Sequence, residues 1–130
     1  MEPESIPPPL SDGQLEIMQL VWDRGEVTVT EVWTALSKRK TVARNTVLTL
    51  MDRLEKKGWL RRRNEGSSHL YSPTRPKQAT LGGVVKQLVD TAFSGSAEAL
   101  VLALISGRGV TKEEADRIRK LIDQAQNRRS

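Results

Sequence analysis

Polar and cationic side chains recur on one face of a helix that the sequence predicts from about residue 42 to residue 57. The set comprises Arg44, Asn45, Thr46, Thr49 and Arg53. The opposite face is apolar at helical spacing and is expected to meet a core through Val47, Leu50, Met51 and Leu54. Guanidinium, amide and hydroxyl groups bind base edges and phosphates. The pattern therefore indicates recognition of nucleic acid.

The polar residues of this helix differ in the contacts they favour. Thr46 and Thr49 lie three positions apart, and a threonine reaches bases or phosphates while its methyl packs on the methyl of thymine. Asn45 suits adenine, and it equally suits capping of the helix start. Arg44 can meet a base or a phosphate, and the sequence leaves both open. Arg53 lies more than two turns into the helix, where a phosphate contact is expected.

A basic hairpin follows this helix. Gly58 ends the helix, and Lys57 lies in the last turn, where cations suit the helix dipole. Lys57 is also a candidate for contact with DNA. Residues 59–63 (WLRRR) run into a polar tip at 64–68, and residues 69–72 (HLYS) return as a second strand. Successive side chains of a strand point to opposite faces, so the three arginines cannot all reach one DNA backbone. Arg62 and His69 are the candidates for contact, and the alternative is that both are simply solvated.

Positive charge is concentrated in the same region. Residues 38–63 hold ten Lys or Arg against two carboxylates, a local balance of +8, whereas the whole chain carries +5. Such a patch favours nucleic acid, because each neutralised phosphate releases counterions. A basic helix followed at once by a basic hairpin is typical of a winged helix-turn-helix, whose helix enters the major groove while the hairpin straddles the neighbouring backbone. The alternative is a solvated basic face.

The composition excludes several other kinds of site. The 130 residues include no cysteine, which rules out disulfides, thiol catalysis and cysteine-ligated zinc, and His69 is the single histidine. A lone histidine cannot build a metal site and no glycine-rich phosphate loop is present, so we expect no enzyme, no metal and no cofactor. No apolar run approaches the ~20 residues of a membrane span, and the start MEPESIPPPL lacks the features of a secretory signal. A cytoplasmic protein with no membrane partner is expected.

Residues 11–75 are predicted to form the DNA-binding domain. Ser11 or Asp12 caps a first helix, and Thr28 with Glu31 forms a capping box for a second. The expected core positions are Leu15, Met18, Val21 and Trp22 in the first helix and Val29, Val32, Trp33 and Leu36 in the second, with Trp59 and Tyr71 from the hairpin. Residues 1–10 are predicted to be a flexible Pro-rich tail, with a partner-binding peptide as the alternative.

Residues 76–130 are predicted to form a helical dimerisation domain. Three helices are expected, with breaks at 93–96 and 107–110, and their apolar surface exceeds what roughly 55 residues can bury alone. A second copy of the chain is the economical way to cover it. The positions assigned to this interface are Leu81, Val84, Val85, Leu88, Phe93, Leu100, Val101, Leu104, Ile118, Leu121 and Ile122.

Several short motifs occur in an order that resembles a known family. They are LEIM at 15–18, VW at 21–22, NTV at 45–47, TL at 49–50, RL at 53–54, KKG at 56–58, LYSP at 70–73 and LVL at 100–102. Over about residues 10–125 the chain resembles the penicillinase-repressor (BlaI/MecI/CopY) family of bacterial winged-helix transcription regulators. The resemblance implies a homodimeric repressor on an operator of dyad symmetry, and it matches Arg53 to the family's contact arginine.

Two departures from the family bear on how DNA is released. The copper-responsive branch carries a C-terminal cysteine cluster that this chain lacks, so metal sensing of that type is not expected. In the β-lactam branch a membrane sensor triggers cleavage of an Asn-Phe bond within the fifth helix, and the matching positions here are Ala103-Leu104. A regulatory protease is retained as a candidate partner, with a specificity other than that for Asn-Phe.

The sequence thus predicts a mostly α protein with a small β wing, in which an N-terminal winged helix-turn-helix precedes a three-helix C-terminal dimerisation region. The function indicated is a homodimeric repressor that binds double-stranded operator DNA through its third helix and basic wing. The alternative is a winged-helix module for protein interaction or for nonspecific architectural DNA binding.

Overall fold

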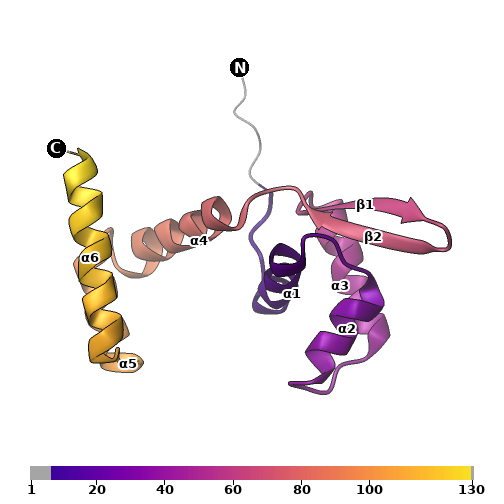
Figure 1. Cartoon of the computed structure of the whole chain (residues 1–130), viewed down its shortest axis with the longest axis horizontal. Coiled ribbons are helices and arrows are strands. Elements are labelled where there is room, and N and C mark those ends of the chain that lie inside the picture. The colour runs from indigo at the N-terminus through magenta and orange to yellow at the C-terminus, as the bar shows by residue number, and fades with distance from the viewer. Residues whose placement is uncertain (1–6, 130) are drawn as a thin grey trace. The chain divides into compact units, whose positions relative to one another are not determined.

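Six helices and one two-stranded sheet make up residues 7–129, the part of the chain that the computed structural model describes (Figure 1). The elements are α1 (Asp12–Arg24), α2 (Val29–Ser37), α3 (Arg44–Lys56), β1 (Leu60–Glu65), β2 (Ser68–Pro73), α4 (Lys77–Ala92), α5 (Ala97–Gly107) and α6 (Lys112–Arg129). The two strands form the hairpin called the wing below. The predicted class, mostly α with a small β wing, is confirmed.

Helices α1 and α2 each begin with a reciprocal capping box. In α1 the Ser11 hydroxyl accepts from the Gln14 N–H at 3.2 Å, and the Gln14 side chain accepts from the Ser11 N–H at 2.9 Å. In α2 Thr28 and Glu31 form the same pair of bonds at 3.1 and 2.9 Å, which confirms the box predicted there. Each box satisfies two N–H groups that a helix start leaves without partners.

The hydrophobic core lies among α1, α2, α3 and the base of the wing. Its buried residues are Ile17, Met18, Val21, Val27, Val29, Val32, Leu36, Val47, Met51, Leu54, Trp59, Leu60 and Tyr71. Most predicted core positions are confirmed, but Leu15, Trp22 and Trp33 are half-buried. Gln14 and Ile17 take the buried positions beside Leu15 on α1. The buried face is rotated toward Ile17 because α1 packs against both α3 and β2.

Three tryptophans attach connecting segments to this core. The indole N–H of Trp22 donates to the Arg75 carbonyl oxygen at 2.9 Å, and that of Trp33 donates to the Val42 carbonyl at 2.9 Å. Trp59 donates to the carbonyl of Pro8 at 2.8 Å. Each ring thus packs its apolar body against the core and uses its polar edge to hold a backbone carbonyl outside the helices.

The predicted flexible tail over residues 1–10 falls into two parts. Residues 1–6 lie outside the described residues. Pro7 is buried, Leu10 packs against the core, and Pro8 accepts the bond from Trp59, so residues 7–10 are attached to the domain rather than loose. The sequence suggested mobility because prolines cannot continue a helix, but apolar burial and one hydrogen bond hold this stretch.

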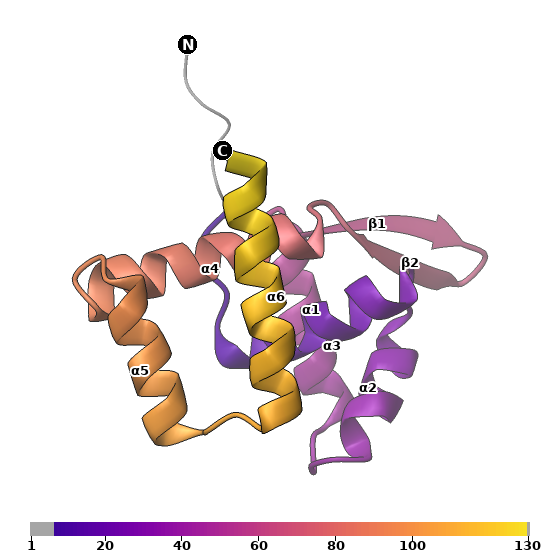
Figure 2. The same cartoon turned by 60° about the vertical axis from the view of Figure 1, so that its left-hand side comes forward.

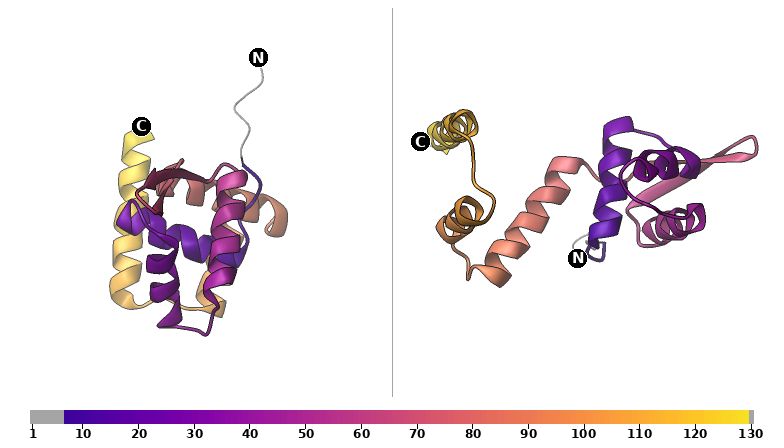
Figure 3. Two further views of the ribbon diagram at one scale, coloured as in Figure 1. Left: turned by 90° about the vertical axis from the view of Figure 1, so that its right-hand side faces the viewer. Right: turned by 90° about the horizontal axis from the view of Figure 1, so that it is seen from below.

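The wing is a regular antiparallel hairpin that projects away from the helices (Figure 3). Arg62 is opposite Tyr71, Arg63 is opposite Leu70, and Val27 adds an isolated bridge to Tyr71 from the other side of β2. Because paired residues share a face and successive residues alternate, Arg62 lies on the face of the buried Tyr71. Arg61 and Arg63 lie on the opposite face.

The chain divides into two compact units inside α4, between Gly82 and Gly83, rather than at the predicted boundary of 75–76. The start of α4 belongs with the first unit, where Thr80 is buried and Trp22 holds Arg75. The second unit contains the rest of α4 with α5 and α6, which Figure 2 shows as separate rods joined by short loops. No residue of α5 is buried, although that helix is strongly apolar.

Helices of the second unit also bear on whether the chain could enter a bilayer. No single helix of the described chain has both the length and the apolar composition of a membrane span. Helices α4 and α5 meet the criteria as a pair, but they are bent by 95° at the break between them.

Candidate nucleic-acid interface

Helix α3 presents its polar face to solvent because its other face is held in the core. Val47, Met51 and Leu54 are completely buried, while Arg44, Asn45, Thr46, Thr49 and Arg53 are all exposed. Ala43 is the N-cap, and no side chain caps this helix start. Asn45 therefore does not serve as a cap in this structure, and its contact with a base stays a prediction.

Five residues of α3 line one open depression on the surface of the domain. They are Asn45, Thr46, Thr49, Leu50 and Arg53. Leu50 was expected in the core; it is half-buried, packs against the core and also lines this depression. An amide, two threonine hydroxyls with their methyls, a leucine and a guanidinium offer together the donors, acceptors and apolar contact that reading of base edges requires.

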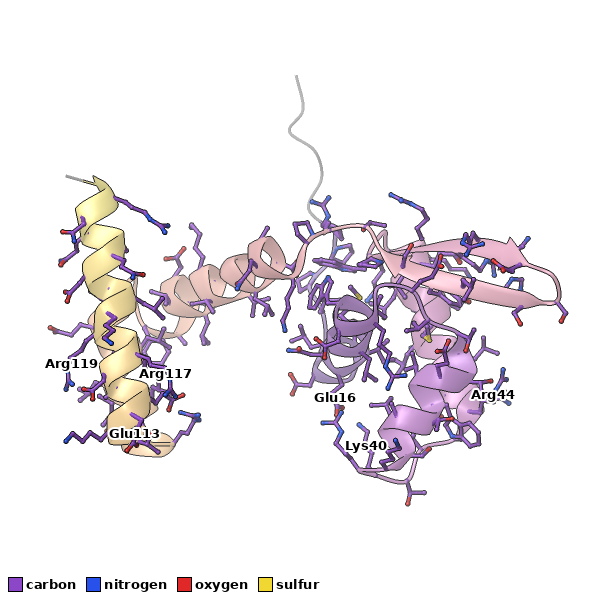
Figure 4. All side chains as sticks on the ribbon, viewed as in Figure 1. Glu16, Lys40, Arg44, Glu113, Arg117 and Arg119 are labelled. Carbon is purple, nitrogen blue, oxygen red and sulfur yellow. The ribbon has the colours of Figure 1, made fainter. Side chains whose placement is uncertain are left out.

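The ion pairs of the structure divide the ten cations of residues 38–63 into two groups. Arg39 and Lys40 pair with Glu16 at 3.3 and 2.6 Å, and Lys56 pairs with Asp52 at 3.0 Å (Figure 4 shows Glu16 and Lys40). Arg62 and Arg63 pair with carboxylates as described below. No ion pair joins the remaining five to a carboxylate of the described chain. These five are Lys38, Arg44, Arg53, Lys57 and Arg61.

Arg44, at the start of α3, is held by a hydrogen bond instead. Its Nε donates to the Thr30 hydroxyl of α2 at 3.2 Å, and Figure 4 places Arg44 at the outer edge of the domain. The bond leaves the terminal nitrogens of the guanidinium free to bind an anion. Arg44 is thereby oriented while it keeps its charge uncompensated.

The three wing arginines have different surroundings. Arg62 lies 3.6 Å from Glu55 of α3, and Arg63 forms a bidentate pair with Glu26 at 2.7 and 2.9 Å and a further bond with Glu65. Arg61, on the same face as Arg63, has no ion pair within the described residues. Arg61 was not among the predicted contacts. Because successive side chains of a strand alternate between faces, Arg62 shares the face of the core residue Leu60 and Arg61 lies on the opposite face, and this alternation is the signal that could have separated the two arginines.

His69 belongs to the wing, as expected. Its Nδ1 lies 2.7 Å from the Asn64 Oδ1, directly across the hairpin, and its side chain is exposed. No group of three or more His, Cys, Asp or Glu that could hold a metal ion occurs in the described part of the chain. The imidazole is thus placed to form a hydrogen bond across the hairpin.

Two carboxylates next to these cations are electrostatically perturbed. The hydrogen bond from Lys40 lowers the pKa of Glu16, and the hydrogen bond from Arg63 lowers the pKa of Glu26. Both carboxylates therefore stay ionised at neutral pH and compensate the cations that they hold. Within the described residues, the cations of this region that no ion pair compensates are Lys38, Arg44, Arg53, Lys57 and Arg61.

The predicted dimerisation residues lie in α4, α5, α6 and the break before α5. Seven of them are exposed large hydrophobic residues, namely Val84, Val85, Leu88, Val101, Leu104, Leu121 and Ile122. Leu81, Phe93, Leu100 and Ile118 are half-buried. Leu102 and Ile105 of α5, which were not assigned to the interface, are exposed by 65% and 52%. Helix α5 is apolar over most of its surface, so its sequence shows no single stripe that would set these two residues apart.

Comparisons with known proteins give one consistent result. Residues 10–124 match the model of the family described as penicillinase repressor. The chain is 26% identical over 122 residues to the penicillinase repressor of Bacillus licheniformis, covering 94% of this chain and 95% of that protein. It is 31% identical over 115 residues to the transcriptional regulator BlaI of Mycobacterium tuberculosis, covering 87% and 82%.

One of the solved structures similar to this chain was determined together with DNA. The solution structure of monomeric Bacillus licheniformis BlaI in complex with the blaP half-operator is 34% identical, with a TM-score of 0.50. The match covers 56% of this chain and 89% of that one. The similarity thus extends to a winged helix that was solved together with DNA.

Proposed function

The chain belongs to the penicillinase repressor family, a family of DNA-binding transcription regulators and not of enzymes, and from this premise we propose that it acts as a homodimeric, sequence-specific repressor. It binds double-stranded operator DNA of dyad symmetry through α3 and the wing. The observation that carries the proposal is the depression on α3, where Asn45, Thr46, Thr49 and Arg53 come together on a face that the core leaves exposed.

The unpaired cations support DNA as the ligand of this face. Arg53 lines the depression, Arg44 lies at the start of α3, Lys57 directly follows α3, and Arg61 is the second residue of β1. Together with Lys38 they make five uncompensated charges in each protomer. If all ten of a dimer met phosphates, the logarithm of affinity would fall with the logarithm of salt concentration with a slope of about −9, since each phosphate contributes about −0.9.

Exposed apolar residues of the second unit support dimerisation. Large hydrophobic side chains on α4, α5 and α6 are 40 to 65% exposed. Large exposed apolar surfaces mark interaction sites. A second copy of the chain brings a matching apolar surface, and two-fold symmetry then places two α3 helices on the two halves of a dyad-symmetric operator.

Selection from a random duplex library by the full-length chain tests the whole proposal. We expect the selected sequences to contain an inverted repeat and to bind at least about a thousandfold more tightly than random duplex at physiological salt. Equal affinity for both would favour a nonspecific architectural protein. No affinity for either would favour a winged-helix module for protein interaction.

Release from DNA is proposed to follow cleavage by a regulatory protease or loss of the dimer, since each monomer then loses the avidity of the pair. The described residues offer no cluster of metal ligands, so we expect that copper(I) and zinc leave operator binding unchanged at fixed ionic strength. Release at one equivalent of either metal would contradict this expectation.

A further inference from the structure

The wing depends on few contacts with the body of the domain. An isolated two-stranded hairpin is marginally stable in water, so something besides its own ladder must hold its direction. At its base, Tyr71 is buried and pairs with Val27 at 2.8 and 2.9 Å. Towards the tip every residue from Arg61 to His69 is exposed, and Asn64 and Glu65 form their side-chain bonds within the wing.

Two ion pairs join the wing to the body, one on each face. Arg62 approaches Glu55 of α3 at 3.6 Å, which is too long for a good hydrogen bond. Arg63, one residue nearer the tip, meets Glu26 through Nε at 2.7 Å and Nη2 at 2.9 Å. A bidentate guanidinium–carboxylate pair defines direction as well as distance. Glu26 directly precedes Val27, so the pair and the backbone bridge act side by side.

We propose that Glu26 is a positioning residue for DNA binding, which holds the wing in the direction needed for contact through its bidentate pair with Arg63. The inference rests on the proposed DNA-binding function and adds a role to residues outside the contact surface. Arg63 then binds Glu26 and does not contact a phosphate. Arg61, which lies beside it on the same face of the wing, is the arginine that remains available for the DNA backbone. A wing held in place beforehand loses less conformational freedom on binding.

Glu65 provides a matched control. It also binds Arg63, but it lies on the same strand, so this ion pair does not connect the wing to the helices. E26Q and E65Q each remove one negative charge near the same guanidinium, so simple electrostatics predicts that both bind DNA slightly more tightly than the unmodified chain. Positioning predicts opposite signs: E26Q loses affinity and E65Q does not.

The test measures binding and wing motion separately. Affinity of the full-length chain and both variants is measured on the selected duplex, and we expect E26Q to bind about two- to fivefold more weakly, since exposed ion pairs are weak. Ser67→Cys at the wing tip accepts a single spin label because the chain has no cysteine. In the DNA-free protein we expect a more mobile spectrum for E26Q and an unchanged one for E65Q.

Both results are needed together. Unchanged or tighter binding of E26Q overturns the proposal, and so does weaker binding with an unchanged spectrum, because Glu26 would then act otherwise than through the wing. If the unmodified chain selects no sequence, the proposed function fails, whereas the spectra still decide whether Glu26 holds the wing.

Discussion

Leu102→Ala tests the dimer through the most exposed large hydrophobic residue of the described chain. Leu102 is 65% exposed on α5, so a partner surface has most of this side chain still to cover. The substitution removes three carbon atoms, each of which contributes about 0.8 kcal/mol of hydrophobic free energy when it becomes fully buried. Because only the 65% still exposed can be buried by a partner, the expected loss of dimerisation free energy is roughly 1.6 kcal/mol per protomer. A two-fold interface contains the residue twice, which gives about 3 kcal/mol per dimer.

A loss of about 3 kcal/mol corresponds to a dimer dissociation constant roughly 200-fold higher. Sedimentation equilibrium across nanomolar to micromolar concentrations measures it, since the 14.5 kDa monomer and the dimer separate clearly. Leu48→Ala is the matched control, because Leu48 is 39% exposed but lies on α3. An unchanged constant for Leu102→Ala, or equal weakening by both variants, would refute dimerisation through α5.

Three further predictions concern the DNA-binding domain. Arg53→Ala should weaken binding to all duplexes and reduce the salt slope of the affinity by about one unit. Thr46→Ala should cost about 1–3 kcal/mol of binding free energy on the selected sequence and little on random DNA. Equal losses on both duplexes for Thr46→Ala would contradict its assignment to bases. Glu16→Gln should lower the melting temperature by a few degrees at pH 7. The difference should shrink as pH falls below 4.5, because the pKa of Glu16 is lowered in the folded state and the stabilisation by its ion pairs is lost on protonation. A difference in melting temperature that is constant with pH would exclude the ion pairs as its cause. Trp59→Phe removes the donor to the Pro8 carbonyl and should lower the free energy of unfolding by about 1 kcal/mol, as measured by thermal melting. This loss should disappear when residues 1–9 are also deleted.

Local features of this protein followed from the sequence because they depend on residues a few positions apart. The capping box of Thr28 and Glu31 spans three residues, and the polar and apolar faces of α3 follow from the helical period. Gly58 ends α3 with φ of +92°, a conformation that glycine adopts without a steric penalty. Short-range patterns of this kind were therefore enough to indicate the family, the fold class and the face of α3 that carries the candidate contacts.

Contacts between distant residues were decided by the tertiary structure. Nothing local to Arg63 indicates that it is bound to Glu26, 37 positions away, and Arg61 and Arg63 look alike in the sequence although one is free of ion pairs in the described chain and the other is held. The attachment of Pro8 to Trp59 and the rotation of the α1 core face toward Ile17 are of the same kind. Composition and period determine which side chains can be buried or charged, but the partner of each depends on which segments the folded chain brings together, and that is set by the packing of the whole core.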